Sequence, residues 1–413
     1  YFPVEREGVL LPYFIGVRNG DSQGLDLVVD GNEHVIRARF ADAAFFVGND
    51  MKRPLPEYLP RLATLSFQAD LGSMLDKTHR IEELVNGLAP QLGLDAKETA
   101  TARRAAALCK ADLVTEMVVE MTSLQGVMGR YYALQAGETE AVAEAIFEHY
   151  LPRTPGDRAP ASKPALLVGL ADRLDSLMGL FAAGLAPTGN KDPFGLRRVA
   201  LGLVQNLVAW GLDFDLRGAI LATAMRLPVP STARQRAEAL EFIAGRQRST
   251  LLEEGFRYDV VDAVLAEQAH NPASAVRAAR ELSTWVARSD WGEVLPGFAR
   301  CVRITRTQPS QGEVKLAAFA EPAERALYAA VQIAEAAPHR AGSVDDFLGN
   351  FTPMLPAITR FFEEVLVMDE NEAVRAQRVQ ATRWTQGRSE LDRLGEERTA
   401  VTAALEAAQE ART

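Results

Sequence analysis

The sequence predicts a mainly α-helical protein of several domains, with a small α+β segment at its N-terminus. Three observations favour this class. The chain has 413 residues, which by usual domain sizes corresponds to roughly two to four domains. Hydrophobic residues make up 47% of it and charged residues 24%, as in ordinary globular proteins. Apolar residues recur at helical spacing over 71–405, whereas the first 70 residues hold short apolar runs between turn signals.

The first 70 residues are expected to be the end of an upstream α+β domain, because the chain opens without a methionine and reads as part of something longer. Residues 10–17 and 25–29 are predicted strands. The second is followed by a turn signal at Asp30-Gly31, and the pattern becomes helical from Asn32.

Further along, helical spacing predicts helices at residues 103–119, 138–149, 165–185 and 196–212. A Pro-rich stretch at 153–164 separates the second from the third. The segment Pro228-Val229-Pro230 marks a boundary, and three shorter charged helices follow over 231–290. A last helical region begins beyond Pro296 and the polar stretch 308–313, and it ends in an Ala/Glu-rich tail.

Composition excludes several classes of protein. The chain has 45 Lys and Arg against 55 Asp and Glu, a net charge of −10, which argues against a nonspecific polyanion binder but permits a local basic face. Its two cysteines, Cys109 and Cys301, exclude a disulfide scaffold and a CxxC zinc site, and they favour the reducing cytoplasm. No uncharged apolar run approaches the roughly 18 residues of a membrane span, and no signal peptide is visible.

The usual catalytic motifs are absent from the sequence. The five histidines are His34, His79, His149, His270 and His339. None is followed by Asp, and there is no HExxH, no GxSxG and no Gly-rich phosphate loop. His149 falls at a predicted helix end, where a positive charge would suit the helix dipole. We therefore expect no catalytic residue and no metal site in this chain.

Two charged segments stand out within predicted helices. Asp112, Glu116 and Glu120 recur every four residues, so they would share one helix face that is either solvated or balanced by cations. Asp172, Arg173 and Asp175 lie within an apolar helix, where buried charges need partners.

A third charged segment precedes the helix predicted from residue 196. Asp192 can act as its N-cap and Pro193 as its first residue. Arg197 and Arg198 then lie in the first turn, against the helix dipole, which costs about a few tenths of a kcal/mol. Either partner carboxylates or a phosphate ligand would offset this cost.

These segments, in this order, resemble the beta subunit of bacterial glycyl-tRNA synthetase. The motifs are Lys110-Ala-Asp-Leu-Val-Thr, Gln125-Gly-Val-Met-Gly, Ala171-Asp-Arg-Leu-Asp and Lys191-Asp-Pro-Phe-Gly-Leu-Arg-Arg. Upstream, Tyr1-Phe-Pro-Val, residues 31–43 and Asp76-Lys77-Thr78 are similar to the same family. The resemblance covers roughly residues 1–378.

The resemblance implies one part of a two-component glycine–tRNA ligase in the cytoplasm. In that family a class II alpha component forms glycyl-adenylate with ATP and Mg, and the beta component binds tRNA-Gly. The partner would be a separate alpha subunit or a fused alpha domain, and the complete enzyme a hetero-tetramer or dimer. This chain alone is then expected to be inactive, with no cofactor of its own.

The resemblance also implies a domain order. Residues 1–70 would end an upstream domain, 71–228 would form an HD-like helical domain, 229–290 a helical linker region, and 291–413 an anticodon-binding-like helical domain with a divergent tail. In a working HD hydrolase, an adjacent His-Asp dyad and a later Asp hold a metal. Lys110, Asp112 and Asp172 stand at about these positions here, without the His. The resemblance therefore implies a dismantled metal site.

The candidates for tRNA contact are Lys191, Arg197, Arg198, Arg300, Arg303, Arg306, Arg375 and Arg378. The first three are assigned to the acceptor side of the tRNA. The arginines at 300, 303 and 306 recur every three residues, so they would form a phosphate-contacting stripe on the anticodon side. The last two fall in the family's closing pattern, from which this chain departs at Gln377 and Val379. Residues 379–413 do not match the family.

Two other functions stay open at this point. An HD phosphohydrolase would bind a divalent metal and release phosphate from nucleotides, and the missing His-Asp pair is the feature that argues against it. A helical scaffold without a nucleic-acid role would bind tRNA no better than an acidic control protein does.

Overall fold

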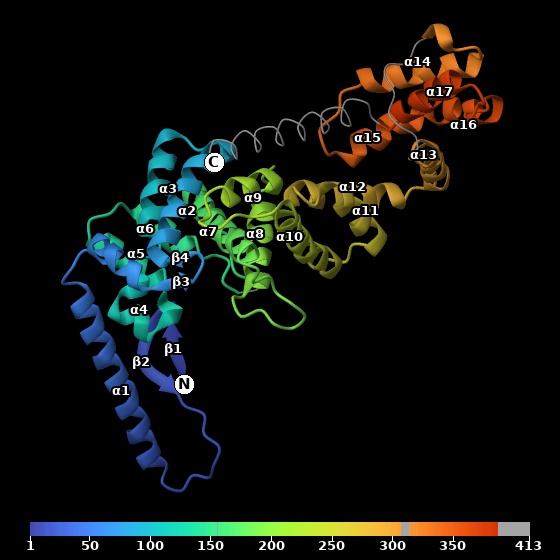
Figure 1. The fold of residues 1–413 in the computed structure, drawn as a ribbon. Coiled ribbons are helices and arrows are strands. Elements are labelled where there is room, and N and C mark those ends of the chain that lie inside the picture. Colours follow the sequence, from blue (N-terminus) through green and yellow to red (C-terminus); the bar gives the residue numbers. More distant parts are fainter. Residues whose placement is uncertain (155, 307–313, 315, 387–413) are drawn as a thin grey trace. The chain divides into compact units, whose positions relative to one another are not determined.

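A computed structural model describes the chain except for residues 155, 307–313, 315 and 387–413 (Figure 1). Its described elements are helices and two small two-stranded sheets, which confirms the predicted mainly α-helical class. The chain forms two compact units. Unit 1 comprises Tyr1–Asn206 and Gly218–Arg236, and unit 2 comprises Leu207–Arg217 and the described part of Ala237–Thr413. The four predicted domains stay a prediction.

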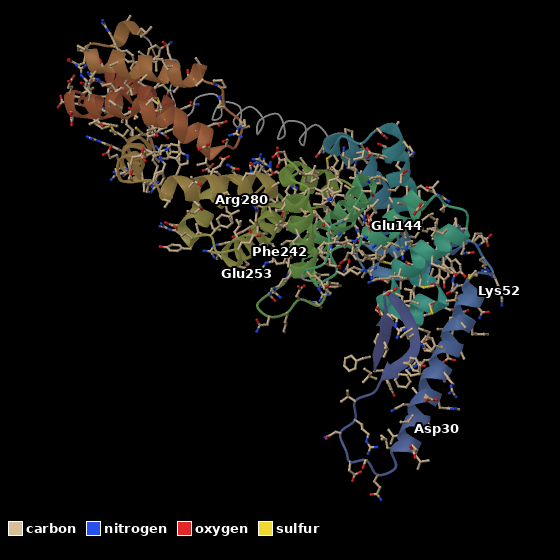
Figure 2. The ribbon with its side chains drawn as sticks, turned by 180° about the vertical axis from the view of Figure 1, so that it is seen from behind. Asp30, Lys52, Glu144, Phe242, Glu253 and Arg280 are labelled. Carbon is tan, nitrogen blue, oxygen red and sulfur yellow. The ribbon has the colours of Figure 1, made fainter. Side chains whose placement is uncertain are left out.

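Unit 1 begins with an antiparallel hairpin and a long helix. Strand β1 (Phe2–Arg6) pairs with β2 (Val9–Ile15), which confirms the first predicted strand, and α1 (Leu25–Asp50) follows. The strand predicted at 25–29 is wrong, as is the turn at Asp30-Gly31, because these residues form the first turns of α1 (Figure 2). A glycine inside a helix costs only about 1 kcal/mol, and a helix this long tolerates it.

The body of unit 1 is helical. Its elements are η1 (Leu55–Thr64), β3 (Ser66–Gln68), β4 (Gly72–Ser73), α2 (Met74–Leu88), η2 (Ala89–Leu92), α3 (Ala96–Leu108), η3 (Ala111–Val114), α4 (Glu116–Glu120), η4 (Thr122–Leu124), α5 (Val127–Gln135), α6 (Glu140–Glu148), α7 (Lys163–Ala182), and most of α8 (Leu196–Ala209) and α9 (Leu216–Ala224). Helices α2, α3 and α6 pack on α7, which is buried along most of its length. The helices predicted at 138–149, 165–185 and 196–212 are confirmed within a few residues.

The single helix predicted over 103–119 is wrong. Helix α3 ends at Leu108, and the short elements η3 and α4 follow. Asp112 is fully buried, whereas Glu116 and Glu120 are exposed, so the three carboxylates do not share a helix face. The buried Asp50 carboxylate, at the end of α1, accepts the first two N–H groups of α4 at 2.8 and 3.0 Å. This tertiary cap fixes a new helix start that periodicity could not reveal.

Unit 2 is helical throughout its described elements. These are most of α10 (Ala233–Glu253), α11 (Tyr258–Gln268), α12 (Pro272–Val286), α13 (Trp291–Thr305), η5 (Leu316–Ala318), α14 (Pro322–Ala336), α15 (Val344–Phe351), η6 (Thr352–Met354), α16 (Leu355–Glu364) and α17 (Glu372–Trp384). The three helices predicted within 231–290 are confirmed. One core gathers around Phe351 and Phe361, and a second around Val261 and Ala279.

Two sequence predictions concern segments outside the described residues. They are the polar stretch 308–313 and most of the Ala/Glu-rich tail. Among the helices that are described, none combines the length and the apolar run needed to cross a membrane.

Candidate functional site

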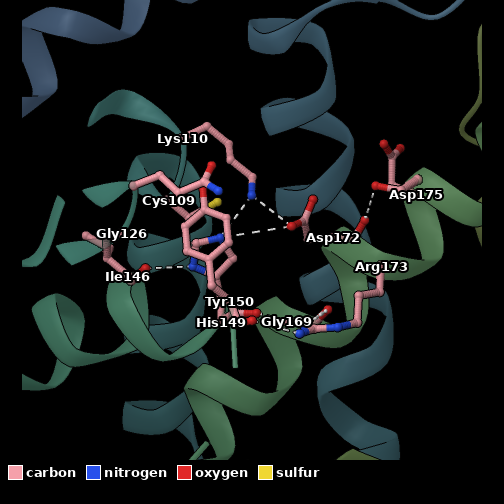
Figure 3. Close-up of polar contacts among 12 residues, drawn as sticks. Cys109, Lys110, Gly126, Ile146, His149, Tyr150, Gly169, Asp172, Arg173 and Asp175 are labelled. Carbon is pink, nitrogen blue, oxygen red and sulfur yellow. Dashed lines mark hydrogen bonds and ion pairs between the residues drawn. The ribbon is translucent and has the colours of Figure 1, made fainter. Parts of the chain in front are cut away.

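A cluster of charged side chains lies buried in unit 1, where α7 meets α2 and the segment after α3 (Figure 3). Asp172 of α7 is at its centre. Its Oδ2 lies 2.8 Å from Lys110 Nζ, and its Oδ1 lies 2.9 Å from Lys77 Nζ. Burial raises the pKa of Asp172, but the two ammonium groups outweigh burial and hold that pKa well below its usual range. Asp172 is therefore a carboxylate balanced by two internal cations.

His149 completes this cluster. Its Nε2 lies 3.0 Å from Lys110 Nζ and its Nδ1 lies 2.6 Å from the carbonyl oxygen of Ile146 (Figure 3). This geometry suits a neutral ring whose Nδ1–H donates to the carbonyl and whose Nε2 accepts from the lysine. Burial and the charge of Lys110 lower the pKa of His149 well below its usual value. A positive charge would suit the dipole at this helix end, but desolvation of the buried ring dominates.

The other charges of α7 are also partnered. Asp175 is fully buried; its Oδ1 lies 2.6 Å from Arg80 Nε and its Oδ2 lies 3.0 Å from Lys77 Nζ. Arg173 donates to the carbonyls of residues 149–151 at 2.7–3.0 Å, and burial lowers its pKa to about 10. The prediction that these charges are paired is confirmed, with carbonyl rather than carboxylate partners for Arg173.

The Asp112 carboxylate binds backbone N–H groups at the start of α5. Its Oδ2 accepts the N–H groups of Gly126 and Gly129 at 2.6 and 2.9 Å. A Cβ at residue 129 would lie only 2.9 Å from this oxygen, so the close approach requires glycine there. Burial raises the pKa of Asp112 to about 6, although these two backbone donors lower it.

The centre does not fit a metal ion. Within the described part of the chain, no group of three His, Cys, Asp or Glu side chains is arranged to hold one. Both oxygens of Asp172 already face ammonium groups, which only donate hydrogen bonds and would repel a divalent cation. The arrangement instead ties α2 and the segment after α3 to α7.

The loop before α8 is fixed by its own hydrogen bonds. Thr188 and Lys191 exchange two backbone bonds of 3.2 and 2.9 Å. Asp192 accepts from the N–H groups of residues 196 and 197 at 2.8 and 2.9 Å, so its predicted capping role is confirmed. Pro193 is not the first helical residue, because Gly195 has a φ of +65° and α8 begins only after it. The chain makes an extra turn there that the N-cap pattern did not anticipate.

The three acceptor-side candidates lie within residues 188–198, with Lys191 on this loop and Arg197 and Arg198 in the first turn of α8. Arg197 is partly buried, donates to the Gly189 carbonyl and lies 4.0 Å from the Asp192 carboxylate. Lys191 and Arg198 are exposed, and no carboxylate of the described residues lies within 4.0 Å of either cation. The ring of Phe194, 41% exposed, lies between them in the sequence.

The anticodon-side candidates lie on α13 or at its end. Arg300, Arg303 and Arg306 are all exposed. The Arg300 guanidinium stacks 4.4 Å from the centre of the Phe362 ring and donates to the carbonyl of the same residue at 3.3 Å. Arg303 bonds to Ala299 O within its own helix. Contact with tRNA stays a prediction for all three.

The last two candidates have internal partners. Arg378 is 7% exposed; its Nε lies 2.5 Å from Glu324 Oε1, and its Nη1 lies 2.9 Å from Asp369 Oδ2. A buried cation needs such partners, so the position of Arg378 does not fit its predicted contact with tRNA. Arg375 is partly buried and donates to Asp369 O and Glu372 Oε1.

Sequence reasoning did not connect Lys77, His149 or Phe194 with the charged residues that lie near them. Lys77 follows the capping box of Ser73 and Asp76, which sets the register of α2. That signal was visible in the sequence, but the carboxylates facing Lys77 lie 95 and 98 residues away. Phe194 lay within a motif that was read for its charges alone.

Comparisons with known proteins agree with this description. Residues 1–266 match the family described as glycyl-tRNA synthetase beta subunit. The chain is 39% identical over 386 residues to the glycine–tRNA ligase beta subunit of Clostridioides difficile and 40% identical over 390 residues to that of Desulforudis audaxviator. Each match covers 92% of this chain and 56% of the relative. The beta subunit of Haemophilus influenzae (strain PittEE) is 39% identical over 397 residues, 94% of this chain and 57% of the relative.

The chain thus belongs to the glycyl-tRNA synthetase beta subunit family. It spans just over half the length of the curated relatives that it matches.

Proposed function

We propose that this chain is a tRNA-binding part of the beta component of a glycine–tRNA ligase. It binds tRNA-Gly while a class II alpha component forms glycyl-adenylate from ATP, with Mg, and transfers glycine. The observation that carries the proposal is the family match over residues 1–266, supported by relatives whose names are glycine–tRNA ligase beta subunit.

The buried centre of unit 1 supports a scaffold role. Lys110 and Lys77 balance Asp172, and His149 is neutral and fully enclosed. None of these side chains offers a free acid, base or metal ligand to a substrate. This favours an HD-like unit that touches the tRNA or the alpha component over one that hydrolyses phosphate esters.

The binding itself would rest on local positive surfaces. The chain as a whole is acidic, with a net charge of −10, so phosphates must meet separate groups of cations. The exposed arginines of α13 and the exposed cations of the loop before α8 supply two such groups. Their contacts with phosphate would release counterions, so affinity would fall as salt rises.

The alpha component would be a separate subunit or a fused domain, in a cytoplasmic hetero-tetramer or dimer. Because the chain spans just over half of its relatives, the sharpest test uses a chimera. The matching segment of the Clostridioides difficile beta subunit is replaced by this chain, and glycylation of tRNA-Gly is measured with and without an added alpha subunit.

We expect glycylation by the chimera with the alpha subunit and none without it. A folded chimera that stays inactive with the alpha subunit would contradict the proposal. So would glycylation by the isolated chain, or tRNA binding no stronger than that of an acidic control protein.

A further inference from the structure

We infer that the loop of residues 188–198 binds an unpaired RNA nucleotide, whose base stacks on Phe194 while neighbouring phosphates pair with Lys191 and Arg198. The inference rests on the proposed function, since it takes the RNA to be tRNA. The proposed function names only cations that meet phosphates. The inference goes further, because it names a residue that contacts a base and specifies that the RNA is unpaired there.

The loop is ordered by contacts of its own. Two backbone hydrogen bonds between Thr188 and Lys191 close a tight turn. The Arg197 guanidinium donates to the Gly189 carbonyl and so ties this turn to the start of α8. The Asp192 carboxylate fixes the end of the loop to the start of α8. A surface held in place before binding loses less conformational entropy when a ligand arrives.

At the start of α8, side chains rather than backbone N–H groups would make the contacts. The N–H groups of residues 196 and 197 are occupied by Asp192, and those of 198 and 199 by the Gly195 carbonyl. The beginning of α8 is therefore closed to an anion. The exposed side chains of this segment include the Phe194 ring and two cations, together with Thr188, Asn190 and Pro193.

The Phe194 ring has polar neighbours in the sequence. Asn190, Lys191 and Asp192 lie two to four residues before it, with Pro193 in between, and Arg198 follows four residues later. A docking face for an apolar protein segment would place the ring among other apolar side chains. A ring flanked by cations instead matches a nucleotide, which offers an aromatic face and an adjacent anionic phosphate.

The local charge is positive. Lys191, Arg197 and Arg198 face only one carboxylate within the loop, that of Asp192, which is already hydrogen-bonded to backbone. The two exposed cations lie three and four residues from Phe194, so their Cα atoms are at most about 11 and 14 Å from its Cα. Both long side chains therefore reach phosphates that flank a base stacked on the ring.

The nucleotide must be unpaired. Inside an A-form duplex, the faces of the bases are covered by their neighbours, and only loops, bulges and ends offer a free face. The ring therefore discriminates single-stranded from duplex RNA, whereas the two cations bind the phosphates of either.

The test compares binding of tRNA-Gly, a single-stranded RNA of about 12 nucleotides and a blunt-ended RNA duplex of about 12 base pairs, by fluorescence anisotropy at low salt. Phe194→Ala should weaken single-strand binding about tenfold and leave duplex binding unchanged. Phe194→Trp should retain binding and show tryptophan quenching with the single strand. The matched control is Phe45→Ala, which removes an exposed ring on α1 and should change nothing.

A second pair of variants tests the cations. The double variant Lys191→Ala, Arg198→Ala should weaken binding of both the single strand and the duplex. It should reduce the salt slope of single-strand binding by about 1.4. The control Lys97→Ala, Arg103→Ala removes the same charge from exposed positions on α3 and should have a smaller effect.

The outcomes separate this inference from the proposed function. If the wild-type chain binds tRNA and Phe194→Ala binds the single strand equally well, the inference is wrong and the proposed function stands. It is also wrong if Phe194→Ala weakens association with an alpha subunit instead of RNA. If the wild-type chain does not bind tRNA, both fail.

Discussion

Lys110 Nζ lies 2.8 Å from Asp172 Oδ2. The two residues stand at positions that would hold the metal in a working HD hydrolase. The two residues are 62 positions apart, and the lysine is almost completely buried. The carboxylate that would ligate a metal is thus balanced by the protein's own cations. The centre ties α2 and the segment after α3 to α7.

Lys110→Met should destabilise unit 1. Removing one partner of a buried ion pair typically costs about 3–5 kcal/mol, and the lower end applies here because Lys77 still faces Asp172. The measurement is the free energy of unfolding by urea. Lys97→Met, at an exposed position on α3, is the control and should change it by less than about 0.5 kcal/mol. Equal stability of the two variants would contradict the role given to Lys110.

Asp112 should make stability decrease as pH rises. Its pKa is raised from 3.8 to about 6 in the folded chain, so between these values the folded state binds more protons than the unfolded state. The protonated carboxyl contributes about 3 kcal/mol to the free energy of unfolding. This contribution is fully present below about pH 4 and is lost as pH rises through 6.

The measurement that isolates this effect compares unfolding free energies of the wild type and Asp112→Asn from pH 4 to 7. The wild type should lose stability relative to the variant across this window. The shift at Asp172 has the opposite sign and acts at lower pH, because its pKa is depressed. Parallel profiles would show that Asp112 does not titrate there.

Arg378→Met should destabilise unit 2 by about 3 kcal/mol, because it leaves the buried Glu324 carboxylate without its cation. The salt slope of tRNA binding, measured on the folded variant, should not change. A stable variant with weakened tRNA binding would restore Arg378 as an RNA contact. Thermal unfolding and fluorescence anisotropy, measured on one preparation, decide whether Arg378 stabilises the fold or contacts RNA.

Replacing Arg300, Arg303 and Arg306 by alanine should flatten the salt slope of tRNA binding by about 2, since each phosphate contact contributes about 0.7–0.9. The matched control replaces Arg248, Arg257 and Arg288, which are each paired with a nearby carboxylate. Anisotropy titrations at several salt concentrations provide the slopes. An unchanged slope for the α13 variant would remove this helix from the tRNA interface.

Local pattern was enough to predict several parts of this protein. Apolar spacing and prolines predicted α6, α7 and α8 within a few residues, and turn signals located strand β2. The apolar context of Asp172 and Asp175 predicted that their charges are paired. These features depend on neighbours a few residues away, which the sequence displays directly.

Other features depended on distant contacts. The helix predicted over 103–119 is broken because Asp50 caps α4, and because Gly126 and Gly129, at the start of α5, donate to the Asp112 carboxylate. His149 is neutral because the fold buries it beside Lys110.

By itself, the sequence determined the helical class, most helix positions, the family and the clusters of cations. Only the tertiary structure decided which cations stay free. Arg378 was predicted to contact tRNA together with exposed residues such as Arg303, yet it is enclosed with the Glu324 carboxylate of a distant helix. The physical reason is that a charge is available to a ligand only if folding leaves it solvated and without a carboxylate partner, and both conditions are set by segments far away in the chain.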